Sequence, residues 1–287
     1  MNSSAFAPSV SVFANNEAIL CISSMRMKEE DANKCHNYLA FCEPESKVNR
    51  YSRKDIVDWC FEVADALELS LETVHVALTF FDRYLSSAKT KSSQEAINSL
   101  PLFELAAAVS LYLATHLYEP YKSGESVDVF IQMSPRDYSQ MDVISMEQDI
   151  LSALDRHMDI PTPMDFVREL LHLLPSEFHT QLLQCCEKYF YKATCDIYYS
   201  FYRPSVVGAG ILASSLVETN LLSVSERNQF WNHLTHAVDL IGAMEVQKKL
   251  LLKRTRPMLK LSEESRMKQI AVSSEDPVLI TLSARGA

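Results

Sequence analysis

The stretch Arg53-Lys-Asp-Ile-Val-Asp-Trp59, together with Phe80-Phe-Asp-Arg-Tyr-Leu-Ser86, decides the fold of this chain. The first stretch opens one amphipathic helix, and the second closes the next helix along the chain. Each stretch sets one charged residue among apolar ones, Arg53 in the first and Asp82 in the second. A charge held near a core is costly unless it is paired. We therefore expect Arg53 and Asp82 to form an ion pair that fixes how the two helices cross.

Capping residues mark where these two helices begin. Ser52 is the predicted N-cap of the first helix, because Asp55 follows three residues later as in a capping box. Ser70 is the predicted N-cap of the second helix. Apolar residues then recur at helical spacing and form one stripe on each helix. The stripe residues are Ile56, Trp59, Cys60, Val63, Ala64 and Leu67 in the first helix, and Val74, Leu78, Phe81 and Leu85 in the second.

Two further helices are apolar on almost every side. Residues 102–117 are rich in alanine, and residues 206–217 contain Gly208 and Gly210. A helix that is apolar all round is surrounded by other helices, and its small residues let them approach closely. Pro161-Thr-Pro163 separates the two regions by ending one helix and starting the next. The remaining expected helices are 127–133, 139–154, 164–174, 177–201, 225–240 and 245–253.

The chain therefore predicts an all-α protein with two tandem bundles of about five helices each. We place a mobile N-terminal arm at residues 1–34, with a short helix near its end. The two bundles occupy residues 35–160 and 161–258. Residues 259–287 form a predicted mobile C-terminal tail, in which Val278-Leu-Ile-Thr-Leu282 is a candidate docking segment.

Composition restricts the classes of function. The 287 residues are 47% hydrophobic and include only five glycines, which excludes general disorder and favours helices. The net charge of −10 argues against a nucleic-acid partner, because basic residues supply that affinity. The seven cysteines contain no Cys-x-x-Cys spacing and are typical of reduced intracellular thiols. We expect no membrane span, no cofactor and no metal; His233 and His236 alone are a weak candidate pair.

The order and spacing of several short motifs between residues 36 and 256 resemble the cyclin family, whose members carry two cyclin boxes in tandem. The motifs include features shared by D-like and by A/B-like mitotic cyclins, so they assign no subtype. The residues that carry the resemblance are Arg53, Asp82, Leu105, Leu113-Ala-Thr-His116, Met146-Glu147, Pro161-Thr162 and Pro204-Ser205.

The resemblance implies a regulatory subunit, rather than an enzyme, that binds and activates a cyclin-dependent serine/threonine kinase in cell-cycle control and cell division. It implies a location in the nucleus and cytoplasm, and partners that are the kinase and substrate or inhibitor docking peptides. Arg53 and Asp82 match the internal ion pair of the family. The positions that match its kinase-binding surface are His116, Leu117, Glu119, Glu147 and Arg156.

Three departures from the family pattern modify this expectation. His116 stands where most cyclins have a lysine, and Arg156 stands where many have an aromatic contact, which favours an acidic partner surface. The third departure lies in the peptide-docking groove of the family. In that groove Ser52 and Asp55 replace apolar residues, so we expect weaker docking that favours basic peptides. The predicted groove residues are Ile56, Trp59, Glu62, Phe103 and Glu104.

Simpler interpretations remain open for most of these residues. In these interpretations the Arg53–Asp82 pair is purely structural, Trp59 is a core residue, and His116 and Glu147 form an ordinary surface pair. The basic run 248–256 is either a nuclear signal or a helix C-terminus. The alternative functions are a cyclin-fold adaptor, a transcription-factor-like protein without kinase activation, and an all-helical enzyme. No glycine-rich phosphate loop, Asp-rich metal motif or catalytic triad supports the enzyme.

Overall fold

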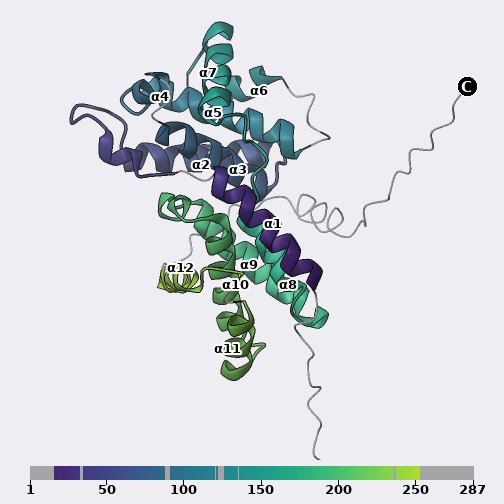
Figure 1. Cartoon of the computed structure of the whole chain (residues 1–287). Helices are drawn as coiled ribbons and strands as arrows, with labels where there is room; N and C mark the ends of the chain where they lie inside the picture. Colours follow the sequence, from purple (N-terminus) through teal and green to yellow (C-terminus); the bar gives the residue numbers. More distant parts are fainter. Residues whose placement is uncertain are drawn as a thin grey trace, which may run out of the picture.

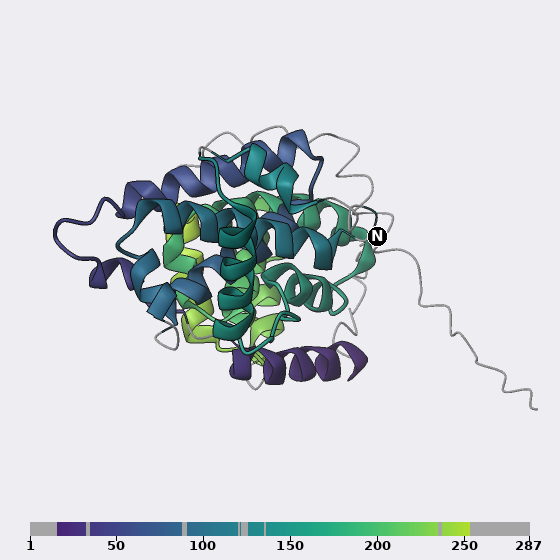
Figure 2. The same cartoon turned by 90° about the horizontal axis from the view of Figure 1, so that it is seen from above.

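Helices α2 to α7 form one bundle, α8 to α12 form a second, and α1 lies along the second bundle beside α8 (Figure 1). Figure 2 shows α1, in purple, on the outside of the molecule. The computed structural model describes residues 16–32, 35–87, 91–119, 121, 126–134, 136–234 and 237–252, and these residues contain helices but no strand. The all-α prediction is therefore confirmed.

Most helices lie where the sequence pattern predicts them. In the first part of the chain they are α1 Asn16–Ala32, η1 Tyr38–Phe41, α2 Arg50–Ala66, α3 Leu71–Ser86, α4 Lys91–Ala96, α5 Leu100–Tyr118, α6 Val127–Gln132 and α7 Gln140–Ala153. In the second they are α8 Pro163–Leu171, η3 Ser176–Phe178, α9 His179–Thr194, η4 Ile197–Phe201, α10 Pro204–Thr219, α11 Val224–His233 and α12 Leu240–Leu252.

Helices α5 and α10 are the central helices of their bundles. By length and composition α5 would also pass for a membrane-spanning helix, with 19 residues and a mean hydropathy of 1.4. Its apolar window is 61% buried inside the protein, so packing against its neighbours accounts for the composition. In α10, a Cβ atom on Gly208 would lie 2.5 Å from the carbonyl oxygen of Pro163. A Cβ atom on Gly210 would collide with Val246 of α12, so both glycines are needed for close helix packing.

The predicted N-cap of α2 was wrong. The helix begins at Arg50, and the side chain of Asn49 accepts a hydrogen bond from the backbone N–H of Tyr51 at 2.8 Å. Ser52 occupies the third helical position, and its hydroxyl accepts a hydrogen bond from the backbone N–H of Asn49. Asn and Ser are both good capping residues, and the pair three residues apart forms its own capping box without Asp55.

Other boundaries also differ from the prediction. Residues 16–32 form a 17-residue helix, longer than the short helix expected in the N-terminal arm, and α4 was not predicted. The expected long helix 177–201 is divided, because the Asp196 side chain accepts a bond from the N–H of Tyr198 and starts η4. Similarly, α11 ends at His233, and Asp239 accepts a bond from Gly242 N–H in the first turn of α12. Residues 1–15 and 259–287, predicted to be mobile, lie outside the described residues.

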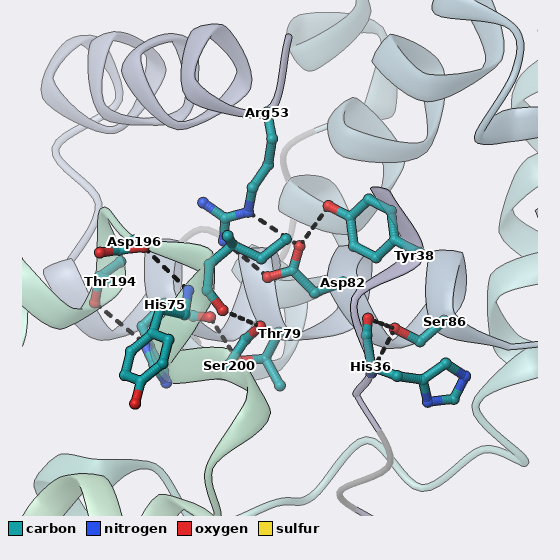
Figure 3. Close-up of polar contacts among 12 residues, drawn as sticks. His36, Tyr38, Arg53, His75, Thr79, Asp82, Ser86, Thr194, Asp196 and Ser200 are labelled. Carbon is teal, nitrogen blue, oxygen red and sulfur yellow. Dashed lines mark hydrogen bonds and ion pairs between the residues drawn. The ribbon is translucent and has the colours of Figure 1, made fainter. Parts of the chain in front are cut away.

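Arg53 and Asp82 form the expected ion pair, and the structure adds a third residue to it (Figure 3). Arg53 Nε and Nη2 donate to the two Asp82 carboxylate oxygens at 3.2 and 2.8 Å. The Tyr38 hydroxyl donates to Asp82 Oδ1 at 2.9 Å. Burial lowers the pKa of Arg53, but Asp82 outweighs this and the pKa is raised. The pair is 4% and 1% exposed and thus joins η1, α2 and α3 inside the core.

The two bundles meet along a polar seam next to this pair. His75 of α3 lies 3.1 Å from the hydroxyl of Thr194 on α9, and its ring lies 4.8 Å from the ring of Phe190. Arg53, Asp82 and His75 also line a cavity of about 40 Å³ whose other walls come mainly from the second bundle. Further along α3, Glu72 forms an ion pair with Arg168 of α8.

Helix α1 is held to the second bundle by a buried carboxylate. Glu29 accepts hydrogen bonds from the backbone N–H of Ser205 at 2.9 Å and from its hydroxyl at 2.5 Å. Ser205 lies in the first turn of α10, where backbone N–H groups lack partners within the helix. Arg203 and Glu30 form an ion pair beside this contact. Glu29 therefore attaches α1 to the second bundle by accepting hydrogen bonds from the first turn of the central helix α10.

The Arg53–Asp82 pair gives a first prediction. Asp82→Ala leaves Arg53 and the Tyr38 hydroxyl buried without their acceptor, and we expect a loss of about 3–5 kcal/mol in the free energy of unfolding. The double variant Arg53→Met with Asp82→Leu removes both charges, so it should lose clearly less than Asp82→Ala. Urea unfolding followed by circular dichroism measures all three proteins. A double variant at least as unstable as Asp82→Ala would contradict a coupled pair.

His75 gives a second prediction. Burial, and next the charge of Arg53, lower the pKa of His75 from its ordinary 6.5 to about 3. The unfolded chain then binds the proton more tightly, so the contribution of His75 is complete above pH 6.5 and is lost as the pH falls toward 3. Between pH 7.5 and 5.0 we expect a loss of at most about 2 kcal/mol, since His75 is half-buried beside the cavity.

Urea unfolding at pH 7.5, 6.0 and 5.0 isolates this effect when the wild type is compared with His75→Gln. Glutamine keeps a polar partner for Thr194 but does not titrate, so the other histidines contribute equally to both proteins. The stability difference between the two proteins should change in favour of the variant as the pH falls. A difference that stays constant across the three pH values would contradict a neutral His75 in the folded protein.

Candidate functional site

The face of the first bundle formed by α5 and α7 carries most of the predicted kinase-binding residues. His116 lies near the end of α5, where its ring lies 4.3 Å from the ring of Tyr112. Its Nδ1 atom is 3.3 Å from the Tyr112 carbonyl oxygen. Glu147 of α7 is half-buried. The pKa of Tyr112 is raised mainly by burial of its ring hydroxyl and secondly by the negative charge of Glu147. Tyr112 is therefore close to both predicted residues.

His116 and Glu147 do not bond to one another directly. Among the hydrogen bonds and ion pairs of the described residues, none joins these two side chains. Tyr112 is close to each of them, and its ring also packs at 5.9 Å against Phe130 of α6. Sequence reasoning missed Tyr112, although it stands four residues before His116 and hence on the same side of α5.

Glu147 has apolar neighbours on its own helix. Ile144, Glu147 and Leu151 recur at helical spacing along one side of α7, and Ile144 is 41% exposed. Leu117, at the end of α5, is 53% exposed. A carboxylate bordered by exposed apolar side chains is a mixed surface of the kind found in protein interfaces.

Arg156 follows α7 on a strained turn. Asp155 and Arg156 both have left-handed backbone angles, with φ of 50° and 57°. The Arg156 N–H donates to the Leu151 carbonyl oxygen at 3.0 Å and closes the end of α7. Two consecutive non-glycine residues in this conformation cost of order 1–3 kcal/mol each, and such strain is concentrated at functional positions. The exposed Arg156 side chain lines an open depression together with Leu151.

Glu119 has an internal role in the structure. Its Oε1 atom accepts hydrogen bonds from the backbone N–H of Ser70 and from the hydroxyl of Thr73, both at 2.8 Å. Glu119 thereby joins the end of α5 to the first turn of α3. This carboxylate is already engaged, so any contact with a partner would use its second oxygen. The prediction of a kinase contact at Glu119 stays a prediction.

The predicted peptide groove is only partly assembled on the surface. Trp59 is half-buried and donates its indole N–H to the Met133 carbonyl oxygen at 2.7 Å, which ties α2 to the end of α6. Glu62 is exposed on α2, whereas Ile56 is only 6% exposed. Trp59 and Glu62 therefore remain the candidate contact residues on this helix.

The α5 side of the groove differs from the expectation. Phe103 is fully buried, with its ring 4.8 Å from that of Phe81, so it belongs to the core and offers no surface to a peptide. Glu104 forms an ion pair with Arg136, in the segment between α6 and α7. Arg136 therefore neutralises one of the three acids in the predicted groove, which are Asp55, Glu62 and Glu104. Sequence separation hid this contact, because the ion pair joins residues 32 positions apart.

In the part of the chain that the structure describes, no group of three or more His, Cys, Asp and Glu side chains is placed to hold a metal ion. The side chains of His233 and His236 lie outside the described part of the chain.

Comparisons with known proteins agree with this architecture. The family model described as "Cyclin, N-terminal domain" matches residues 21–159, which span the whole first bundle. The chain is 27% identical over 205 residues to G2/mitotic-specific cyclin S13-6 of Glycine max, covering 71% of this chain and 40% of that protein. The chain therefore spans less than half the length of this curated relative.

Solved structures show the same fold. A viral cyclin from herpesvirus saimiri superposes with a TM-score of 0.62 at 16% identity, covering 80% of this chain and 94% of that chain. The yeast RNA Pol II CTD kinase CTDK-1 complex contains a chain with a TM-score of 0.54 at 11% identity, covering 94% and 86%. By sequence, residues 21–159 therefore belong to the cyclin family, and the chain as a whole has the fold of a solved cyclin.

Proposed function

We propose that this chain is a non-catalytic regulatory subunit that binds and activates a cyclin-dependent serine/threonine kinase. The observation that carries the proposal is the position of Glu147 beside Tyr112 and His116, on a half-exposed face of the first bundle, in a chain whose residues 21–159 belong to the cyclin family. One of the solved structures with this fold is a kinase complex, which supports a kinase as the partner.

The proposed mechanism is a shift in the kinase's conformational population. The α5–α7 face binds the active arrangement of the kinase more tightly than the inactive one, and this difference in affinity sets the extent of activation. Glu147 supplies a charge for a basic or hydrogen-bonding group of the kinase, and Arg156 supplies one for an acidic group. Exposed Leu117 and Ile144 provide apolar contact between them.

We propose a nuclear and cytoplasmic location for this role, together with a second, weaker binding surface at Trp59 and Glu62. The exposed acids Asp55 and Glu62 on α2 favour docking peptides that contain basic residues. An adaptor without kinase activation would use the same surfaces, so recovery of kinase activity distinguishes the two functions.

Loss of the Glu147 carboxylate should disrupt the kinase complex. In a pull-down from dividing-cell extract with this chain as bait, we expect Glu147→Ala to lower the recovered histone-phosphorylating activity at least about tenfold, because an interface charge loses its partner. Glu177→Ala, an exposed glutamate of η3 in the second bundle, is the matched control and should retain activity. If the wild-type chain recovers no kinase, the chain is a cyclin-fold adaptor instead.

The proposed peptide surface should depend on charge. A fluorescent peptide containing Arg and Leu anchors should bind several-fold more weakly to Glu62→Gln than to the wild type, and the difference should shrink as salt increases. Glu177→Gln serves as the control with the same chemical change. Equal affinity for a peptide with every basic residue replaced by norleucine would argue against an acidic groove.

A further inference from the structure

The seam between the two bundles contains a small cavity, and the buried guanidinium of Arg53 forms part of its wall. The Nε and Nη2 atoms donate to Asp82, whereas Nη1 makes no hydrogen bond to any residue that the structure describes. In Figure 3 this nitrogen is turned away from Asp82, toward the side of the seam where Thr194 and Asp196 lie. A buried N–H without an acceptor costs free energy, so an acceptor inside the cavity would stabilise the folded chain.

His75 is a second polar residue of the same wall. Its Nδ1 atom lies 3.1 Å from the Thr194 hydroxyl, and its other ring nitrogen bonds to no group within the described ranges. Because burial lowers the pKa of His75 to about 3, the ring is neutral at pH 7 and has one N–H and one acceptor nitrogen. Helices α2 and α3 therefore each bring to the cavity a residue with a polar atom that other described residues leave unused.

The second bundle supplies oxygen atoms on the other side of the cavity. Thr194, Asp196 and Ser200 line it there. Asp196 Oδ1 accepts a hydrogen bond from the backbone N–H of Tyr198, and the Ser200 hydroxyl donates to the Ile197 carbonyl oxygen. A carboxylate accepts several hydrogen bonds and a hydroxyl oxygen accepts two. Both side chains can therefore accept a further bond from a molecule in the cavity.

The size and the wall of the cavity suit water. Its volume is about 40 Å³. One water molecule needs at least about 10–15 Å³ of such space, so the cavity has room for about two or three. A cavity lined only by apolar side chains stays dry. This wall combines the apolar Leu78, Ala193 and Val207 with Arg53 and His75, and the two polar residues make hydration favourable.

The charges around the cavity favour water over an ion. Arg53 contributes one positive charge to the wall, and Asp82 and Asp196 contribute two negative ones. His75 and the thiol of Cys35 are neutral at pH 7, because burial lowers the pKa of the first and raises that of the second. An anion would approach two carboxylates, and a cation would approach the guanidinium. Water accepts from Arg53 and donates to Asp196, so it satisfies both groups.

We propose that the seam cavity is a hydration site, in which an ordered water accepts a hydrogen bond from Arg53 Nη1 and donates, directly or through a second water, to Asp196. A hydrogen bond through a well-ordered water is nearly as favourable in enthalpy as a direct one. The bridge extends the Arg53–Asp82 pair from the first bundle to Asp196, the N-cap residue of η4 in the second. Water thus helps to hold the two bundles together, and Arg53 positions it.

A crystal structure of the full wild-type chain, at a resolution that shows ordered water, tests the proposal directly. We expect electron density for one water within roughly 2.7–3.2 Å of Arg53 Nη1, with a hydrogen-bonded path from it to Asp196. Crystals grown in bromide instead of chloride separate water from an anion, because bound bromide gives an anomalous signal. A lack of density beside Nη1, or an anomalous peak in the cavity, would overturn the proposal.

Urea unfolding tests the bridge in solution. Arg53→Lys keeps the charge but loses the Nη1 donor, and Asp196→Asn keeps an oxygen for the Tyr198 N–H but loses the charge. In the double variant, the combined effect on the unfolding equilibrium constant should be smaller than the product of the single effects by at least about twofold. Asp142→Asn, a capping carboxylate of α7 that does not line the cavity, is the matched control and should act independently of Arg53→Lys. Equal independence of Asp196→Asn would contradict the bridge.

Discussion

The buried ion pair between Arg53 and Asp82 constrains more of this structure than any other single contact. Its two charges are almost completely removed from water, so they are tolerable only while the guanidinium and the carboxylate remain in register. This requirement fixes the crossing of α2 and α3, and Tyr38 extends it to η1. Since the same pair lines the cavity between the bundles, the geometry inside the first bundle also determines the surface onto which the second one packs.

The sequence predicted those parts of the fold that depend on local pattern. The proline and small-residue signals of α10 identified a central helix because backbone approach requires small side chains, and Gly208 and Gly210 do contact neighbouring helices closely. The points at which a helix is interrupted were less predictable. Apolar spacing continues across Asp196, yet the Asp196 side chain bonds to the backbone of Tyr198 and divides the helix. Periodicity reports which residues are buried, whereas a competing local hydrogen bond decides where a helix ends.

In the candidate site, too, local sequence patterns were informative, whereas contacts between residues far apart in the sequence were not predictable. Phe103 was assigned to the groove because it matches a docking position of the family, yet it is fully buried; a helix that is apolar on every side gives no sign of which residues face the surface. Glu104 was predicted to line the groove and Glu119 to contact a kinase, but partners from elsewhere in the fold engage both carboxylates. Only Tyr112 had an overlooked local signal, its place one turn before His116. Charged residues thus reveal their function only when their distant partners are known.

Rigidity connects these internal contacts to the proposed function. A regulatory subunit shifts the population of its partner only when its own surface deforms less than the partner does, since otherwise the binding energy would be spent on the subunit itself. Glu119 locks the end of α5 to the start of α3, and α5 in turn holds Tyr112 beside Glu147. Arg53 and Asp82 hold α3 in place beneath this face. In the proposed function the buried pair would act only by holding this surface in place, so a purely structural role for it is compatible with the proposed regulatory function.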